Sequence, residues 1–194
     1  MIGNNHHLDP IPGEDFQMFE RDLPGENLHG LSFQTASALP LETCETINGA
    51  WGYNMNDHKY KTPPQIQQLV VGAAGRNANL LLNVGPMPTG KIQPEFTDSL
   101  AVVGKWLEAN GRSVYGTRGG PVKPQQWGVT TENASSVFVH LFHKPSEESM
   151  FIPGKYKKAS VLNGAPVKAK IEKNGMRIVV ADVPVGTQVI ELLK

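Results

Sequence analysis

The chain has 194 residues, a hydrophobic fraction of 39%, and 18 basic against 18 acidic residues. A formal net charge of zero provides no field that would attract nucleic acid or an anionic membrane, so a polynucleotide partner is disfavoured. No apolar run approaches the roughly 20 residues needed to span a bilayer, and the opening "MIGNNHHLDP" lacks a signal-peptide pattern. The single cysteine, Cys44, excludes an internal disulfide and leaves the cellular compartment open.

The first 120 residues carry an α/β pattern. The opening "MIGNN" looks like the tail of a strand, and "NLLLNV" has the continuous apolar centre of a parallel strand that is covered on both faces. Trp106 shares an apolar helical face, so we expect it in the core rather than at a ligand. Periodicity and stop signals predict, in chain order, a strand at 41–47, a helix at 62–78, a strand at 79–84 and a helix at 94–111.

The pattern changes near residues 116–124, and beyond them the apolar period falls to two. "SSVFVHLFHK" (135–144) predicts a strand, and Asn163-Gly164 and Asn174-Gly175 are hairpin signals. A further turn signal, "VPVG", occupies residues 183–186. We therefore expect an antiparallel β module of roughly 70 residues, built as a sandwich.

An acidic stretch, "GEDFQMFERDLPGEN" (13–27), holds the first candidate for chemistry. Its acids, interleaved with Phe16, Met18 and Phe19, are Glu14, Asp15, Glu20, Asp22 and Glu26. A solvated loop is the alternative for each of these acids. A carboxyl group beside aromatic rings is partly desolvated, however, and desolvation favours the protonated form that a proton donor needs. Glu20 directly follows Phe19 and is the best placed of the five.

Two other segments are candidates for binding. His6 and His7 are adjacent, so in an extended segment they point to opposite faces and cannot easily share one metal ion. One of them could bond to a substrate hydroxyl, or both could be plain loop residues. Trp51, in "GAWGYN" (49–54), could form a platform for the apolar face of a sugar, with structural burial as the alternative.

The glycine-rich segments give only a weak indication of function. The glycines of "GAAGRN" (72–77) and "NVGPMPTGK" (83–91) fit neither a dinucleotide loop nor a phosphate loop, and we expect no cofactor and no metal. A loop-borne carboxylic acid near an aromatic platform fits a carbohydrate-active site best, because carboxyl groups carry out glycoside hydrolysis. That chemistry usually needs two such groups.

Several of these segments, in order, carry a family resemblance. "GNNHH", "PGEDFQMFERDLPG", "ETCETINGAWGYN", "NLLLNVGPMPTGKI" and "NGRSVYGTRGGP" resemble the second half of the catalytic domain of α-L-fucosidases of glycoside hydrolase family 29. The resemblance implies a partial (β/α) TIM-like barrel over residues 1–119, followed by a small antiparallel β-sandwich over 120–194. It also implies a fucosylated glycan or fucoside as the substrate.

Site roles follow from the same resemblance. The family is a retaining exo-glycosidase family, and the spacing from Asp15-Phe16 to Glu20 matches that of its acid/base residue. Trp51 stands where an aromatic residue contributes to the pocket for the fucose methyl group. His6 or His7 stands where many members carry a basic residue at the site. We therefore predict Glu20 as catalytic, and Trp51, His6 and His7 as substrate-binding.

One departure from the family concerns the second carboxyl group. The nucleophilic Asp of the family lies in a Trp-Phe-Asp-Gly-like context before the segment that resembles "GNNHH", and no "FDG" occurs here. We expect a fragment that is inactive alone and could pair with the missing N-terminal half of the barrel. The alternative is a non-catalytic carbohydrate-binding or interaction fragment. Members of the family are typically exported, but no leader is visible in this chain.

Overall fold

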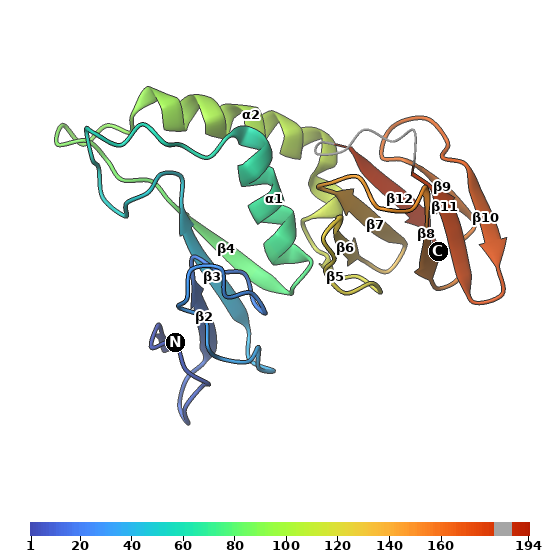
Figure 1. The fold of residues 1–194 in the computed structure, drawn as a ribbon, viewed down its shortest axis with the longest axis horizontal. Helices are drawn as coiled ribbons and strands as arrows, with labels where there is room; N and C mark the ends of the chain where they lie inside the picture. The colour runs from blue at the N-terminus through green and yellow to red at the C-terminus, as the bar shows by residue number, and fades with distance from the viewer. Residues whose placement is uncertain (181–187) are drawn as a thin grey trace. The chain divides into compact units, whose positions relative to one another are not determined.

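The computed structural model describes residues 1–180 and 188–194 (Figure 1). The chain divides into two compact units, residues 1–104 and residues 105–194, which are called unit 1 and unit 2 below. Both helices and strands are present, and antiparallel sheets are confined to unit 2 among the described residues. No helix in these ranges is long and apolar enough to cross a membrane.

Unit 1 contains one parallel sheet in which the strands follow one another in chain order. The strands are β1 (Gly3–Asn4), β2 (Phe16–Glu20), β3 (Leu41–Thr46) and β4 (Ala78–Asn83). The strands predicted at the opening of the chain, at 41–47 and at 79–84 are confirmed, whereas β2 lies in the acidic stretch that the sequence left as a loop. Since all four strands run in the same direction, their carboxyl ends meet at one edge of the sheet.

The two faces of this sheet differ in burial. Phe19 and Thr43, which are paired in register, are fully buried. On β4, which pairs only with β3 among the described strands, burial alternates and Leu81 is 48% exposed. The expectation that residues 79–84 are covered on both faces is therefore wrong for the described structure, because β4 is an edge strand with one open face.

The two predicted helices follow β3 and β4. Helix α1 (Pro63–Ala74) begins after Thr62, whose backbone N–H donates to the Gln65 side chain at 2.8 Å, and prolines fill its first positions. Helix α2 (Pro94–Asn110) runs into a short 3₁₀ turn, η1 (Gly111–Ser113). The helix predicted at 94–111 is confirmed, whereas the one predicted at 62–78 is present but ends at Ala74, since Gly75 caps it and Ala78 already belongs to β4. Helix α1 buries Ile66 and Val71.

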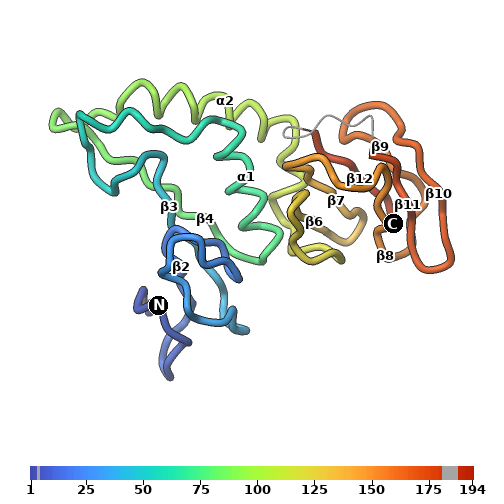
Figure 2. Tube along the Cα trace, in the orientation of Figure 1, coloured from blue at the N-terminus to red at the C-terminus, as the bar shows by residue number. Residues whose placement is uncertain are grey.

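Unit 2 contains two antiparallel sheets. One has the order β5 (Arg118–Gly119), β6 (Gly128–Glu132), β7 (Ser136–Leu141), β12 (Val189–Leu193), β9 (Lys158–Val161), and the other β10 (Ala169–Glu172), β11 (Gly175–Val179), β8 (Ser149–Pro153). Figure 2 traces the chain through them. A single apolar cluster draws side chains from both sheets, including Val139, Ile152, Ile178 and Ile190.

The turn signals of unit 2 behave as predicted where the structure describes them. β10 and β11 form a hairpin in which Glu172 pairs with Gly175, so Asn174 lies in the connection. Asn163 adopts a φ of 60°, and the Gly164 N–H donates to the Val161 carbonyl at 2.9 Å, which closes a tight turn. The turn signal at 183–186 lies outside the described residues. Trp106 packs against a buried cluster of unit 2, which confirms it as a core contact.

Candidate active site

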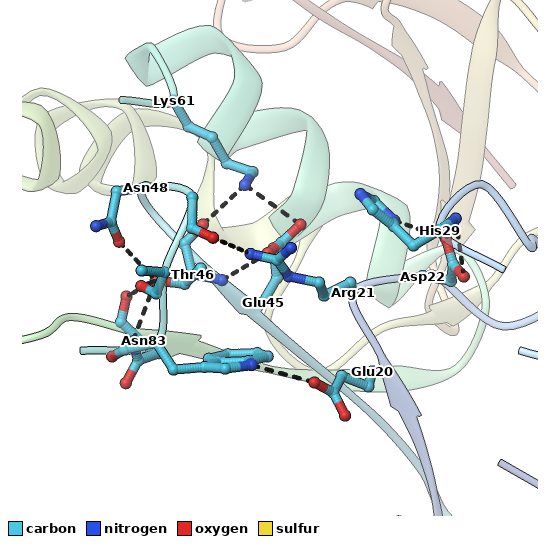
Figure 3. A network of polar contacts seen from close by, with 12 residues as sticks. Glu20, Arg21, Asp22, His29, Glu45, Thr46, Asn48, Lys61 and Asn83 are labelled. Carbon is cyan, nitrogen blue, oxygen red and sulfur yellow. Dashed lines mark hydrogen bonds and ion pairs between the residues drawn. The ribbon is translucent and has the colours of Figure 1, made fainter. Parts of the chain in front are cut away.

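Polar side chains collect at the carboxyl edge of the parallel sheet in unit 1. Glu20 is the last residue of β2, Thr46 the last of β3 and Asn83 the last of β4, and His6 and His7 follow β1. Parallel sheets place ligand sites at this edge, because the loops that leave the strands converge there. Figure 3 shows part of the resulting polar network.

Glu20 is held by two donors from different loops. Its Oε1 accepts from the Trp51 indole Nε1 at 3.1 Å, and its Oε2 accepts from the Asn5 amide at 2.7 Å. His7 Nε2 lies 3.7 Å from the same Oε2, and the Glu20 side chain is 21% exposed. The structure thus brings together three of the four predicted site residues around one carboxylate that solvent can reach.

His6 makes different contacts. Its Nε2 lies 2.9 Å from Oε1 of Glu14, and its Nδ1 accepts from the Leu8 N–H at 3.1 Å. Because Nδ1 accepts a hydrogen bond, the ring hydrogen is on Nε2, which donates a hydrogen bond to Glu14. The two histidines therefore point to different carboxylates, as their adjacency predicted. In the described parts of the chain, no group of three or more His, Cys, Asp or Glu side chains is arranged to hold a metal ion.

The aromatic neighbour of Glu20 is not the one that its sequence suggested. Phe19 is adjacent in the chain and fully buried, but successive residues of a strand point to opposite faces. Trp51, at 39% exposure, supplies the aromatic contact instead. The aromatic partner of Glu20 therefore comes from the loop after β3, which starts next to the end of β2, and not from the neighbouring residues in the sequence.

The loop that carries Trp51 is fixed by the end of β4. The Asn83 side-chain amide donates to the Trp51 carbonyl at 2.8 Å and to Thr46 Oγ1 at 3.1 Å. A Cβ atom at Gly85 would lie 2.5 Å from the carbonyl carbon of Gly52, so position 85 requires glycine for the two loops to approach this closely.

Asp57 closes the far side of the same loop. Its carboxylate accepts from the Lys59 N–H at 3.0 Å and from the Gly49 N–H at 2.8 Å. These two backbone hydrogen bonds, that of Lys59 first, hold the pKa of Asp57 below its usual range. A carboxylate that stays charged in this way keeps both ends of the segment from 49 to 59 in place.

A buried charge lies behind the loop. The Glu45 side chain is 5% exposed, and Lys61 Nζ lies 3.2 Å from its Oε2. Arg21 Nε lies 3.9 Å from Glu45 Oε1 on the other side (Figure 3). These three side chains contribute to the lining of a hollow of about 280 Å³, together with His29, Asn48 and Lys59.

The other members of the acidic stretch bind structural partners. Asp22 is buried and accepts from the backbone N–H groups of Leu28 and His29 at 2.9 and 3.2 Å. Asp15 accepts from the Ile2 N–H, and Glu26 pairs with Arg76. Burial lowers the pKa of Arg76, while Glu26 opposes that effect. Glu20 differs from these acids in accepting a hydrogen bond from an indole at the carboxyl edge.

Sequence reasoning missed four polar residues of this edge, namely Asn5, Arg21, Glu45 and Asn83. Each ends a predicted or observed strand or lies within two residues of its end. That position is the signal that could have found them, because the residues at strand ends are the ones that a parallel sheet gathers.

Comparison with known proteins gives a consistent result. A family model for alpha-L-fucosidases matches residues 1–112. Among curated proteins, the tissue alpha-L-fucosidase of Rattus norvegicus is 31% identical over 114 residues, which cover 55% of this chain and 24% of that protein. The tissue alpha-L-fucosidase of Bos taurus is 33% identical over 108 residues, which cover 54% and 23%.

A solved structure extends the similarity over nearly the whole chain. Alpha-L-fucosidase isoenzyme 1 from Paenibacillus thiaminolyticus is 31% identical with a TM-score of 0.75, covering 93% of this chain and 45% of that one. The chain therefore spans less than half the length of this structure, and its aligned part spans about a quarter of the curated relatives.

Proposed function

This chain belongs to the alpha-L-fucosidase family, and we propose that it forms part of an enzyme that releases terminal α-L-fucose from glycans or fucosides. In this proposal, hydrolysis retains the anomeric configuration and Glu20 is the acid/base residue. The observation that supports the proposal most directly is the position of Glu20. It ends a parallel strand at the carboxyl edge, is open to solvent, and bonds to an indole N–H.

In the first step, the protonated Glu20 carboxyl group gives its proton to the glycosidic oxygen while the bond from that oxygen to C1 breaks. The carboxylate of an Asp attacks C1 from the opposite face and forms a glycosyl ester. We place this Asp outside the 194 residues, since the Phe-Asp-Gly step typical of the family does not occur in the sequence.

In the second step, Glu20 acts as the base. Its carboxylate takes a proton from a water molecule whose oxygen attacks C1, and the ester bond breaks. Fucose leaves, the Asp carboxylate is restored, and Glu20 is protonated for the next cycle. The Trp51 and Asn5 hydrogen bonds fix both carboxyl oxygens, so the group is oriented before the substrate arrives.

We assign substrate contacts to Trp51 and His7. The half-exposed indole offers apolar surface for the C6 methyl group, and the His7 imidazole lies near enough to Glu20 to bond to a sugar hydroxyl. For His6, whose contacts go to Glu14 and the Leu8 backbone, a substrate contact stays a prediction.

The architecture in this proposal is a partial (β/α) barrel over residues 1–119 and a β-sandwich over 120–194. Four parallel strands in chain order and an apolar cluster shared by two antiparallel sheets support it. The remaining barrel strands, which would supply the Asp, are the proposed partner. The open edge of β4 and the exposed Leu81 fit such pairing.

The first test measures fucose release from an aryl α-L-fucoside. The 194-residue chain alone should give negligible turnover, and the chain joined to the N-terminal half of the barrel should be active. Appreciable turnover by the chain alone would show that the nucleophile lies within it. Absence of activity in both would favour a non-catalytic binding role.

The second test changes Glu20 in the joined, active protein. Glu20→Ala should slow substrates with poor leaving groups by roughly 10²- to 10⁴-fold, and activated aryl fucosides far less, because only the former need the proton. With activated aryl fucosides, added azide should restore release of the aryl group, because azide attacks C1 of the glycosyl ester without a base, frees the Asp carboxylate and forms fucosyl azide. Glu108→Gln, an exposed change on α2, is the control. An equal loss with both substrates would remove Glu20 from the acid role.

A further inference from the structure

We infer that Arg21 is a positioning residue that holds the Trp51 ring against Glu20. The role of this contact in catalysis rests on the proposed function of the site, but the contact itself does not. Arg21 directly follows Glu20, and nothing in its sequence context distinguishes it from a surface arginine. The argument comes from the contacts that its backbone and guanidinium make.

The backbone of Arg21 turns sharply as it leaves β2. Its φ is 63°, in the left-handed region that residues other than glycine rarely adopt, and its N–H donates to the Cys44 carbonyl at 2.8 Å. In a regular strand, the side chains of residues 20 and 21 would point to opposite faces of the sheet. The left-handed turn at Arg21 removes this constraint, so its side chain can lie on the same face as Glu20. An unfavourable backbone conformation of this kind persists only where surrounding contacts maintain it.

The guanidinium contacts the Trp51 loop at two points. Its Nη2 donates to the Gly49 carbonyl at 2.8 Å, where the loop begins, and its Cζ lies 5.6 Å from the centroid of the Trp51 ring. A cation at this distance is attracted to the π face of an indole. The same group therefore fixes both the start of the loop and the face of the ring.

Glu45 and Lys61 hold the guanidinium from behind. Arg21 Nε lies 3.9 Å from the buried Glu45 carboxylate, whose other oxygen is 3.2 Å from Lys61 Nζ (Figure 3). Because Lys61 also donates to the Thr46 carbonyl at 2.7 Å, this carboxylate is anchored to the end of β3. Arg21 thus has a fixed counter-charge on one side and the indole on the other.

Other contacts of the loop do not replace this one. Asn83 bonds to the Trp51 carbonyl, and Gly85 admits the backbone of Gly52, so both fix the main chain. Neither contact determines the rotation of the indole about its side-chain bonds. That rotation decides whether Nε1 reaches Glu20 at 3.1 Å. A planar guanidinium can donate in its plane while it lies near a ring, which an ammonium group cannot do as well.

The experiment follows the Trp51 indole N–H in ¹⁵N-labelled full chain by NMR, with the signal assigned from a Trp51→Phe variant. In Arg21→Met, the Trp51 signal should move toward the position of a free indole, and its exchange with water should become roughly tenfold faster. Arg21→Lys should give an intermediate shift. The signals of Trp106 and Trp127 report whether the rest of the chain stays folded.

A matched control is available in unit 2. Arg177 lies 5.7 Å from the Phe151 ring and pairs with Glu172, so Arg177→Met removes the same kind of contact elsewhere. It should leave the Trp51 signal unchanged. An unchanged Trp51 signal in folded Arg21→Met would overturn the inference.

If Arg21→Met does not fold, the inference is tested by NMR on the unaltered chain. Nuclear Overhauser contacts should join the Arg21 methylene protons to the Trp51 ring, and their absence would refute the positioning role. In the active protein, Arg21→Met should lower kcat for poor leaving groups by roughly tenfold, with a smaller change for activated ones. Because the NMR result does not need turnover, failure of the proposed function and failure of this inference are distinguishable.

Discussion

Unit 1 and unit 2 satisfy their buried polar groups to different degrees. In the described residues, the buried side-chain atoms without a hydrogen-bond partner all belong to unit 1, and they are His7 Nδ1, Arg21 Nε, Ser32 Oγ, Gln34 Oε1 and Gln67 Oε1. In unit 2, buried Glu191 accepts from Arg112 through both oxygens and from Ser136. Two of the unpaired atoms, those of His7 and Arg21, lie at the candidate site.

This difference coincides with the position of the candidate site, which lies in unit 1. Unit 2 joins two sheets through one apolar cluster, and in its described residues no buried side-chain nitrogen or oxygen lacks a hydrogen-bond partner. In unit 1, the unpaired atoms of His7 and Arg21 lie next to Glu20. Such groups are rare in native proteins, and a catalytic role is one of the reasons for which they occur. We expect apolar contacts to dominate the stability of unit 2, and hydrogen bonds to charged groups to matter more in unit 1.

The largest expected effect is on the core of unit 2. Ile190 is fully buried on β12, between Val139 of β7 and Val161 of β9. Ile190→Ala should lower the unfolding free energy of unit 2 by roughly 2–5 kcal/mol, because it leaves a cavity in the shared cluster. Urea titration measures the loss. Ile171→Ala, at a residue 62% exposed, should change little, and a similar loss there would break the comparison.

The next effect depends on pH and concerns a buried imidazole of unit 2. Burial lowers the pKa of His140 from 6.5 to about 4, and its Nε2 lies 3.0 Å from Thr131 Oγ1. Between these values the unfolded chain binds the proton and the folded chain does not. The contribution of His140 to stability should therefore fall as pH drops from about 6.5 to about 4, by on the order of 3 kcal/mol, and stay level below that.

The measurement for His140 is a set of urea titrations from pH 4 to pH 7. The difference between the unaltered chain and His140→Gln should carry this pH dependence, because the other titrating groups cancel. The exposed His143→Gln is the control. If the difference in unfolding free energy between the two proteins did not change with pH, the imidazole would have the same pKa in the folded and unfolded chain. The side chain of His140 would then not be shielded from water in unit 2.

A smaller effect is expected for a buried carboxylate of unit 1. Asp22→Ala would leave the N–H groups of Leu28 and His29 without their acceptor, which should cost about 1–3 kcal/mol. Asp22→Asn keeps an acceptor oxygen and should cost less. Equal losses would show that the negative charge, rather than the hydrogen bonds, holds this loop. Thermal unfolding of the three proteins distinguishes the two outcomes.

The smallest effect concerns the reactivity of Cys44. Burial, and secondly the charge of Glu20 on the paired strand, raises the pKa of this thiol. Since the thiolate is the reactive form, alkylation at pH 8 should be slow in the folded chain and normal in urea. Glu20→Gln should speed it a few-fold by removing the negative charge. An unchanged rate would show that burial alone protects the thiol.

Periodicity was sufficient for the regular elements with strong patterns. Helices α1 and α2 and strands β3 and β4 follow from apolar spacing and stop signals, because such stretches bury one face regardless of context. β2 was missed because its buried face combines polar Gln17 with Phe19, while Phe16 and Met18 lie on the other face, so its apolar residues do not alternate. The prediction that residues 79–84 are covered on both faces failed because burial of a strand depends on its neighbours, which a local window does not contain.

The candidate site was predictable only in part, because its contacts also depend on neighbouring strands that a local stretch of sequence does not contain. Glu20 was selected for its neighbour Phe19, whereas its contacts in space come from Asn5, Trp51 and His7. These contacts depend on parallel pairing of β1, β2 and β3, which brings together residues far apart in the chain. Arg21 could not be recognised at all, since its role depends on a left-handed φ and on the position of Glu45.

The glycine at position 85 also restricts how this site can change. Any larger side chain there would meet the backbone of residues 52 and 53, and backbone atoms cannot move aside by changing rotamer. A change in the sequence of the loop after β4 must therefore be accompanied by a change in the loop that carries the indole. In directed evolution of a new sugar preference, libraries that randomise one of these loops alone should yield mostly inactive clones, whereas libraries that vary both should yield functional pairs.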